Sequence, residues 1–520
     1  MTWDAIVIGS GFGGVMAAWP LVQAGHRVLM LERGGWVSRG PHNWTEAEAG
    51  LLTPHYTRES PYRVHAGSHR YEAGAWNCVG GQSVFYGGAS FRFREGDFLS
   101  NPSVIGVSRA EWPIRYEDLE PHYTQVERML GVAGEVGEKD PPRSAPYPQG
   151  AAPLSDSSRR LAAAARRAGM TPTRIPLAIS FDGNGSLRPC MRCGTCDGYA
   201  CAAEAKNDLA TGLIPRLMRQ GMTLRPNTVC VRLRRCGSRI DAVEYVDRIS
   251  GERGTFRAER VVVAAGALAT PHLILASGLA CASPAEHAVG RYLTRHRNAV
   301  VFGVFPGTQM SGGTFDKQVV LLDLYATAGS IQQLTPAPGL VKSYLPAGLR
   351  SLGAHVMSRC AGLLIIAEDQ PRIENGVAID WRTADRFGLP ALQVRHSYSA
   401  RDERSGSKLV RAARQVLHEA GALFTWTHRI ETFSHALGTV RMGPDERTSP
   451  LDALGRFTGL DNLFITDGSA LPRSAGLNPS LTIAANALRI GTAIARSAPA
   501  RRGRALRTMP LHSSPTMAMR

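Results

Sequence analysis

The stretch Asp4-Ala5-Ile6-Val7-Ile8-Gly9-Ser10-Gly11-Phe12-Gly13-Gly14 decides the fold expected for this chain of 520 residues. Its apolar half predicts a buried parallel strand, and the segment that follows, through Leu21 and Val22, predicts a helix. A second strand is expected over 27–31, and Glu32 comes directly after it. Strand, glycine-rich turn, helix and strand in this order form a βαβ unit that is typical of dinucleotide-binding folds.

The glycines and the acidic residue have separate roles in such a unit. Gly9, Gly11 and Gly14 form G-x-G-x-x-G, and with Gly13 they let the backbone approach a pyrophosphate at the helix N-terminus. Glu32 is placed to accept hydrogen bonds from ribose hydroxyls, whereas an arginine there would favour a 2′-phosphate. An ordinary strand-to-helix turn is the alternative interpretation. The unit alone does not separate FAD from NAD.

Composition and charge exclude several classes of protein. With 43% hydrophobic residues and no apolar run of about 18 residues, we expect a globular chain without a membrane span. The βαβ unit begins at residue 4, so we expect no signal peptide and a cytoplasmic location. The formal charge of +17 is spread along the chain, and no nucleic-acid-binding motif is present. The basic tail over 499–520 is expected to be disordered.

The nine cysteines are an odd, unevenly spaced set, which argues against a disulfide scaffold. Cys190, Cys193, Cys196 and Cys201 have the spacing C-x2-C-x2-C-x4-C. A ferredoxin cluster run is similar, but it has x3 before the last cysteine and a proline after it. Zinc is a further alternative. We favour structural thiols or a local disulfide, and we assign no metal ligand.

A second glycine-rich segment covers 77–90. Its pairs Gly80-Gly81 and Gly87-Gly88 suit a backbone that passes close to a flat ligand. A glycine-rich surface loop is the alternative interpretation.

Three other segments carry local predictions. The polar stretch over 38–69 lacks periodicity and is expected to wrap over the surface. The apolar run over 363–367 predicts a short strand, with a buried helical turn as the alternative. The stretch over 372–380 predicts a hairpin around the turn signal Asn375-Gly376.

Five ordered motifs follow the N-terminal unit: G-G-Q-S over 80–83, W-P-I-R-Y-E-D-L-E-P over 112–121, V-V-V-A-A-G over 261–266 with its continuation to Leu279, V-G-R-Y-L-T-R-H over 289–296, and a C-terminal block from H-A-L-G-T at 435–439 through D-G-S at 467–469 to G-L-N-P-S at 476–480. Together they resemble the glucose–methanol–choline (GMC) oxidoreductases, a family that binds FAD. The family pattern is broken at Ala280, which replaces a glycine. The resemblance extends from residue 4 to about 495.

The resemblance implies an α/β fold with a Rossmann-like FAD-binding domain of the GMC type and a substrate domain of the α+β kind, a sheet with helices. Both domains are discontinuous in the sequence. The FAD-binding domain would comprise 1–35, 200–300 and 430–498, and the cap and substrate domain would comprise 36–199 and 301–429.

The resemblance also implies where FAD is contacted. A strand over 228–233 would pass the adenine end, and the helix beginning near Leu481 would bring its N-terminus toward the flavin ring, where its N–H groups favour an anionic reduced flavin. A plain helix that starts after a proline is the alternative for the second feature. The residues expected to contact FAD are Gly9, Gly11, Gly13, Gly14, Glu32, Gly80, Gly81, Ser83, Val229, Ala265, Asp467, Gly468, Asn478, Pro479 and Ser480.

The chemistry implied is oxidation of an alcohol, in which a base takes the hydroxyl proton and the flavin N5 takes the hydride. His435 occupies the position of the family's active-site histidine, and Asn478 occupies that of its partner. Histidine suits a base because its ordinary pKa of about 6.5 lies near working pH. In some members of the family, a histidine within the segment that aligns with 83–86 is linked covalently to the flavin. Phe85 stands there in this chain, so we predict non-covalent FAD.

The stretch over 84–92 and the G-L-N-P-S-L-T-I segment resemble GMC enzymes that oxidise a primary hydroxyl of aminoglycosides. We therefore expect a sugar-like or polyhydroxylated natural product as the small-molecule substrate. A sterol or lipid alcohol is the alternative, because cholesterol and pyranose oxidases share the His/Asn pair. A non-catalytic or light-using flavoprotein and an NAD-dependent dehydrogenase are more distant alternatives. The sequence leaves open whether oxygen or another carrier accepts the electrons.

Overall fold

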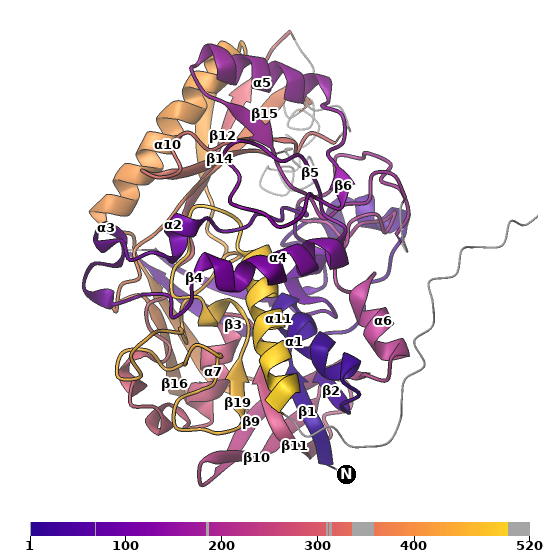
Figure 1. Cartoon of the computed structure of the whole chain (residues 1–520), viewed down its shortest axis with the longest axis vertical. Coiled ribbons are helices and arrows are strands. Elements are labelled where there is room, and N and C mark those ends of the chain that lie inside the picture. The colour runs from indigo at the N-terminus through magenta and orange to yellow at the C-terminus, as the bar shows by residue number, and fades with distance from the viewer. Residues whose placement is uncertain are drawn as a thin grey trace, which may run out of the picture.

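The predicted βαβ unit lies in a seven-stranded sheet of the computed structural model (Figure 1). The structure describes residues 2–67, 69–183, 187–307, 310, 315–334 and 358–497. The predicted tail over 499–520 lies outside these ranges. The strands of the sheet are β1 (Thr2–Ile8), β2 (Val28–Leu31), β8 (Thr223–Arg225), β9 (Thr228–Cys236), β10 (Arg239–Asp247), β11 (Arg253–Val263) and β19 (Leu463–Ile465).

Strand β11 joins the two parts of this sheet. Its C-terminal half runs parallel to both β1 and β19, and β1 in turn runs parallel to β2. Its N-terminal half pairs antiparallel with β10, which pairs with β9. The strand segments over 5–8, 28–31 and 261–263 are apolar and buried, as expected for parallel strands covered on both faces. Their carboxyl ends meet at one edge, where α/β sheets bind ligands.

Two helices distant in sequence cover one face of the parallel strands. Helix α1 (Phe12–Gln23) and helix α11 (Ser480–Ser497) lie side by side over it, and α4 (Tyr116–Leu130) packs against α11 (Figure 1). At Gly491 a Cβ would lie 2.5 Å from the Ala17 carbonyl oxygen, so the two helices approach too closely for a side chain. Within the described residues, no helix is both long and apolar enough to cross a membrane.

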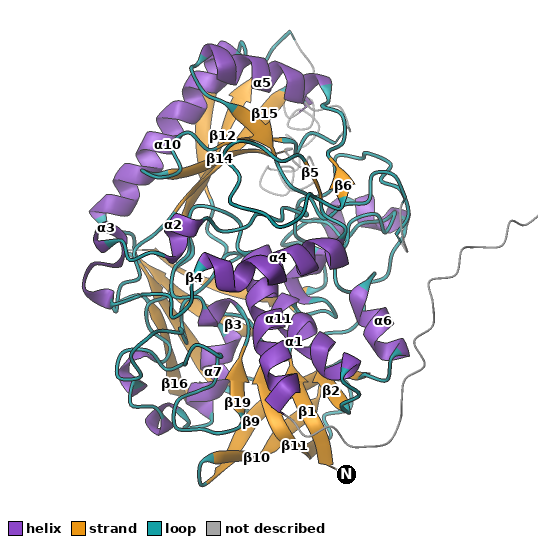
Figure 2. Ribbon diagram, in the orientation of Figure 1, coloured by secondary structure: helices purple, strands orange, loops and turns teal. Residues whose placement is uncertain are grey.

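A second, six-stranded sheet carries helices on one face (Figure 2). Side chains of alternating positions on its strands form a core with α5 (Asp156–Arg167) and α10 (Ala400–Glu419), which begins at the Ser399 cap. The predicted strand over 363–367 is part of this sheet. Its strands are β7 (Pro172–Arg174), β12 (Arg297–Val304), β13 (Val319–Leu321), β14 (Gly329–Leu334), β15 (Cys360–Ala367) and β18 (Phe424–Arg429).

A third sheet contains part of the predicted surface stretch and corrects the predicted hairpin. Most described residues over 38–69 are exposed or partly exposed, and the stretch contains β3 (Tyr56–Ala66), which pairs with β4 (His69–Trp76) and, in parallel, with β17 (Pro390–His396). The hairpin predicted over 372–380 is wrong, because β16 (Gly376–Ala384) begins at the Asn-Gly pair and turns into β17 over 385–389. Gly376 forms a β-bridge with Arg291. A Cβ on Gly376 would lie 2.2 Å from the Gly290 oxygen, so no side chain fits there.

Short elements complete the described chain. They are β5 (Ala133–Gly134), β6 (Gln149–Gly150), α2 (Glu95–Phe98), α3 (Pro102–Ile105), α6 (Leu213–Arg219), α7 (Ala269–Ala276) and the 3₁₀ turns Pro41–Trp44, Glu46–Glu48, Gly81–Val84, Gly106–Ser108, Ala280–Ala282, Glu286–Ala288 and Gly468–Ala470.

Candidate active site

A cavity of about 270 Å³ lies at the carboxyl edge of the parallel strands. It extends from the β2 and β9 ends, at Glu32 and Val229, past the turn after β1, to His435 and the start of α11. Twelve of the sequence-predicted residues line it: Gly9, Gly11, Gly13, Glu32, Gly81, Ser83, Val229, Ala265, Asp467, Gly468, Pro479 and His435. Gly14, Gly80, Asn478 and Ser480 adjoin lining residues without lining the cavity themselves.

The glycines of the first turn pack backbone against backbone. Gly9 has a φ of +103°, and a Cβ there would lie 2.3 Å from the Ala264 oxygen. A Cβ on Gly13 would lie 2.6 Å from the Thr466 oxygen, and one on Gly14 would lie 1.9 Å from the Gly9 oxygen. At Gly11, by contrast, a Cβ meets nothing within 4 Å. The turn is thus closed toward the protein and open toward the cavity, which leaves room for a ligand.

Glu32 is held in place before any ligand binds. One carboxylate oxygen accepts hydrogen bonds from the Ser10 N–H at 3.1 Å and from the Ser10 hydroxyl at 2.6 Å, and the other accepts one from the Gly34 N–H at 2.9 Å. Burial raises the pKa of the Glu32 carboxyl, which these hydrogen bonds partly oppose. Its position at the end of β2 fits an acceptor for ribose hydroxyls.

The second glycine-rich segment lies against the first. The Gly80 N–H donates to the Ser10 hydroxyl at 2.9 Å, and a Cβ on Gly81 would come within 3.4 Å of the Gly11 Cα. Ser83 donates to the Gly80 carbonyl at 2.6 Å and so supports the loop. Both Gly80 and Gly81 have positive φ angles, which explains the glycine pair.

Asp467 follows β19 and holds the next segment. It accepts from the Ser469 and Gly266 N–H groups, both at 2.8 Å, and from the Thr270 hydroxyl. Burial raises the pKa of its carboxyl, and these hydrogen bonds partly oppose that rise. Helix α11 begins at Ser480, whose hydroxyl donates to the Ala89 carbonyl at 3.0 Å, and Pro479 and Ile483 at its start line the cavity.

His435 lines the cavity and contacts a second histidine. The His435 and His296 Nδ1 atoms are 3.0 Å apart, and the two rings are nearly perpendicular, at 88°. The His296 Nε2 lies 2.8 Å from the Ser474 carbonyl oxygen. Burial, together with the positive charges of Lys317 and Arg295, lowers the pKa of His435 well below its ordinary value, so the imidazole is neutral.

Asn478 is buried, with 9% of its surface exposed, and its Oδ1 has no hydrogen-bond partner among the described residues. A buried amide oxygen without a donor costs about 1–3 kcal/mol. Such an atom directly before Pro479, a lining residue, indicates a ligand that supplies the missing donor.

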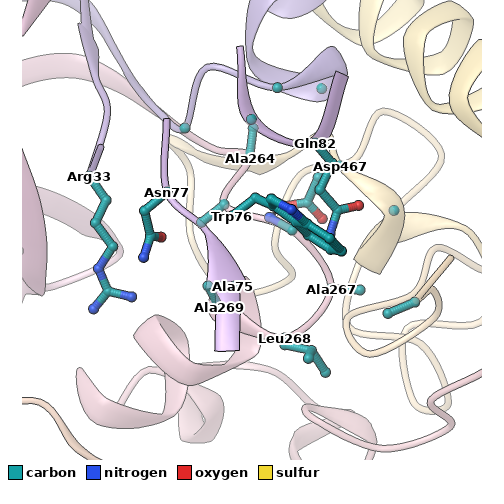
Figure 3. A pocket seen from close by; sticks show the side chains of 18 of the residues that line it. Arg33, Ala75, Trp76, Asn77, Gln82, Ala264, Ala267, Leu268, Ala269 and Asp467 are labelled. Carbon is teal, nitrogen blue, oxygen red and sulfur yellow. The ribbon is translucent and has the colours of Figure 1, made fainter. Parts of the chain in front are cut away.

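Sequence reasoning missed several lining residues. In Figure 3 the Trp76 side chain extends from the strand into the cavity, while Arg33 and Asn77 lie to one side of it. Asn77 is the first residue of the second glycine-rich segment and Trp76 directly precedes it, which is the signal that could have found them. His296 ends a motif that the sequence singled out, but only the structure shows its contact with His435.

The cysteine segment and Phe85 are outside the lining. Among the described residues, Cys190, Cys193, Cys196 and Cys201 carry free thiols, and no group of three or more His, Cys, Asp or Glu side chains is placed to hold a metal ion. Phe85 is buried and stacks on Trp76 with ring centroids 6.5 Å apart. Its ring therefore supports a residue that does line the cavity.

Comparison with known proteins places this geometry in a family. Models of the GMC oxidoreductase match residues 6–298 and 371–487. The chain is 33% identical to 6'''-hydroxyparomomycin C oxidase of Streptomyces lividus and 32% identical to paromamine 6'-oxidase of Streptomyces fradiae, in both cases over 95% of this chain and 91% of the relative. It is 25% identical to cholesterol oxidase of Mycobacterium tuberculosis over 94% of this chain and 90% of the relative.

A solved structure with the same fold is pyridoxine 4-oxidase from Mesorbium loti, with a TM-score of 0.63 and 19% identity, covering 95% of this chain and 99% of that one. The α/β fold, with its Rossmann-like domain and a substrate domain, agrees with the sequence-based expectation. The chain belongs to the GMC oxidoreductases, a family of FAD-binding enzymes.

Proposed function

We propose that this enzyme oxidises an alcohol to a carbonyl compound with non-covalently bound FAD. The observation that carries the proposal is one continuous cavity with the dinucleotide turn and Glu32 at one end and His435 at the other. The open side of Gly11 fits a ligand of this kind, as does the Asn478 Oδ1, which has no hydrogen-bond partner in the part of the chain that the structure describes. FAD, when bound, supplies the acceptor for the hydride that leaves the carbinol carbon.

In this proposal the chain itself holds the cofactor at named positions. Glu32 and Val229 would hold the adenosine end, the turn from Gly9 to Gly14 the pyrophosphate, and Asp467 to Ser480 the ring end. FAD would be bound by residues 1–35, 200–300 and 430–498, and the substrate would be bound by residues 36–199 and 301–429. Phe85 offers no nucleophile for a covalent link.

His435 would take the hydroxyl proton of the substrate. Its pKa lies well below the ordinary value, mainly because of burial, so the ring has a free lone pair at neutral pH. As the O–H proton passes to His435, the C–H bond breaks with both of its electrons and the C=O double bond forms. Asn478 would orient the substrate oxygen and stabilise its developing negative charge with its amide N–H.

The substrate class we infer is a sugar-like or polyhydroxylated natural product. Two relatives at 32–33% identity are oxidases of aminoglycosides by name, paromamine 6'-oxidase and 6'''-hydroxyparomomycin C oxidase. A sterol is the second candidate, favoured by the likeness to cholesterol oxidase at 25% identity.

The test is anaerobic titration of the purified holoenzyme while the flavin absorption is recorded. We expect paromamine-type aminoglycosides or simple sugars to bleach the flavin bands. Bleaching by cholesterol alone would overturn the substrate class and keep the chemistry. Bound FAD that none of these compounds bleaches would contradict the proposed activity and favour a non-catalytic flavoprotein. The rate at which air restores the colour then separates an oxidase from a dehydrogenase that uses another carrier.

A further inference from the structure

Three groups form a hydrogen-bonded row that ends at His435. The His296 Nε2 is 2.8 Å from the Ser474 carbonyl oxygen, and the His296 Nδ1 is 3.0 Å from the His435 Nδ1. A carbonyl oxygen only accepts hydrogen bonds, so the His296 Nε2 must carry a hydrogen. Both nitrogens of His296 are therefore engaged, each with a different partner.

The row determines where the protons lie. Burial lowers the pKa of His296, although the carboxylates of Asp369 and Glu368 act in the opposite direction, so the ring is neutral and has one N–H. With that hydrogen on Nε2, the Nδ1 of His296 is a lone-pair acceptor. The hydrogen between the two rings must then belong to the His435 Nδ1. The His435 Nε2 is left without a hydrogen.

We propose that His296 is a positioning residue, which fixes His435 in the tautomer whose Nε2 lone pair is free to take the substrate proton. The proposal rests on the proposed function for the proton step, because it deepens the role of His435 as base. Without the acceptor at the His296 Nδ1, either nitrogen of the His435 ring could hold the hydrogen, and the ring could rotate away from the substrate.

The surroundings of His296 hold the row in place. Asp369 accepts from the His296 backbone N–H at 3.0 Å and from the Ser474 hydroxyl at 2.9 Å, so one carboxylate anchors both ends of the first hydrogen bond. The other Asp369 oxygen accepts from the Arg295 N–H and from His396, at 2.9 and 3.2 Å. His296 has a φ of 65°, a conformation that non-glycine residues adopt at a cost. Strain at a buried histidine whose backbone N–H is held by a carboxylate fits a functional position.

The charged groups near the two histidines differ in sign. Lys317 and Arg295 face His435 and disfavour its protonated form, and His296 adds to this. Asp369 and Glu368 face His296, and Asp369 is also hydrogen-bonded to His396. The nearby negative groups are therefore those that act on His296, and the nearby positive groups are those that act on His435.

Two substitutions of His296 separate its two hydrogen bonds. In His296→Asn the side-chain oxygen can occupy the position of Nδ1 and still accept from His435, and asparagine tolerates the positive φ. In His296→Gln the amide reaches the position of Nε2 and can still donate to Ser474, but the acceptor for His435 is lost. We expect kcat to fall by about 10²–10⁴-fold in His296→Gln, the usual contribution of a general base, and by about tenfold or less in His296→Asn.

Flavin content, melting temperature and KM are measured for both variants, and we expect a change mainly in kcat. Equal kcat values in the two variants, with flavin bound in both, would overturn the proposal. A matched loss of flavin from both would also count against it, because His296 would then support the fold and not the tautomer.

A readout without turnover tests the tautomer directly. Two-bond ¹H–¹⁵N spectra of ¹⁵N-histidine-labelled holoenzyme distinguish the two neutral tautomers, and His435→Gln identifies the signals of His435. We expect Nδ1 protonated and Nε2 unprotonated in His435, and a different pattern in His296→Gln. A hydrogen on the His435 Nε2 in the resting enzyme would contradict the inference. The expected tautomer together with a fully active His435→Gln would instead contradict the proposed function.

Discussion

The two ends of the cavity differ in how their polar groups are satisfied. At the Glu32 end, one carboxylate oxygen accepts hydrogen bonds from Ser10 and the other accepts one from Gly34. At the His435 end, the buried Asn478 Oδ1 has no hydrogen-bond partner among the described residues, and His296 is held in a left-handed backbone conformation. The Glu32 carboxylate has hydrogen-bond donors before a ligand binds. The Asn478 Oδ1 has no donor among the described residues, and a ligand would supply one.

This difference indicates a division of roles. The polar groups at the Glu32 end already form hydrogen bonds within the protein, so this end can bind a large cofactor without rearrangement. An unsatisfied buried group lowers stability, and it persists where binding or chemistry uses it. Substitutions at the two ends should therefore separate stability from activity in opposite ways.

The largest expected effect is at Gly9. An alanine there would need a left-handed backbone, at a cost of about 1–2 kcal/mol, and its Cβ would lie 2.3 Å from the Ala264 oxygen. We expect Gly9→Ala to lose bound FAD and to unfold at lower urea concentration, as measured by flavin absorbance per protein and by urea titration.

Gly11→Ala is the matched comparison. A Cβ on Gly11 meets nothing within 4 Å, so the apoprotein should keep its stability, while the methyl group enters the cavity and weakens FAD binding. Equal urea midpoints for the Gly9→Ala and Gly11→Ala apoproteins would contradict the difference in packing between these two glycines.

The next largest effect is at His435. We expect His435→Gln to retain FAD and to lose about 10²–10⁴-fold in the rate of anaerobic flavin reduction, because the proton acceptor is gone. His287→Gln is the control, since His287 is exposed and does not line the cavity. Undiminished flavin reduction in His435→Gln would remove this residue from the role of base.

A smaller effect at Asn478 tests the unsatisfied group. Asn478→Leu removes a buried oxygen that has no hydrogen-bond partner within the described residues, so its free energy of unfolding should stay equal or rise, while kcat falls by about 10²–10³-fold. Asn486 is the matched residue, because its Oδ1 accepts from the Arg489 Nε and Nη2 at 3.1 and 2.9 Å. Asn486→Leu should lose about 1–3 kcal/mol of stability. The reverse order of stabilities in urea titration would contradict the difference in hydrogen bonding between Asn478 and Asn486.

The smallest effect is the pH dependence. Burial first, and then His296, Lys317 and Arg295, hold the pKa of His435 well below 6.5, so the acid limb of kcat/KM should lie below pH 6.5. The unfolded chain binds a proton near pH 6.5 and the folded chain does not, so this residue makes stability fall as pH drops below 6.5. The loss is at most about 1.4 kcal/mol per pH unit, and it should be absent from His435→Gln. An acid limb above 6.5 would contradict the assignment.

Local motifs allowed much of the fold to be predicted. The first βαβ unit, the strand over 363–367 and the helix after Pro479 appear where the sequence indicated them. Strand β3 escaped prediction because only one of its faces is buried and its partner β17 lies more than three hundred residues later. The Asn375-Gly376 pair does not form the predicted hairpin turn, because Gly376 packs closely against Gly290. The chain turns at 385–389 instead.

The sequence by itself determined the dinucleotide turn, the order of family motifs and the identities of the residues that we propose for catalysis. These features depend on neighbours within a few positions, where glycine conformations and helix starts are decided locally. Only the tertiary structure decided which side chains share the cavity and where the protons between His296 and His435 lie. Burial and hydrogen-bond partners set those properties, and the partners come from segments of the chain that are more than a hundred residues apart.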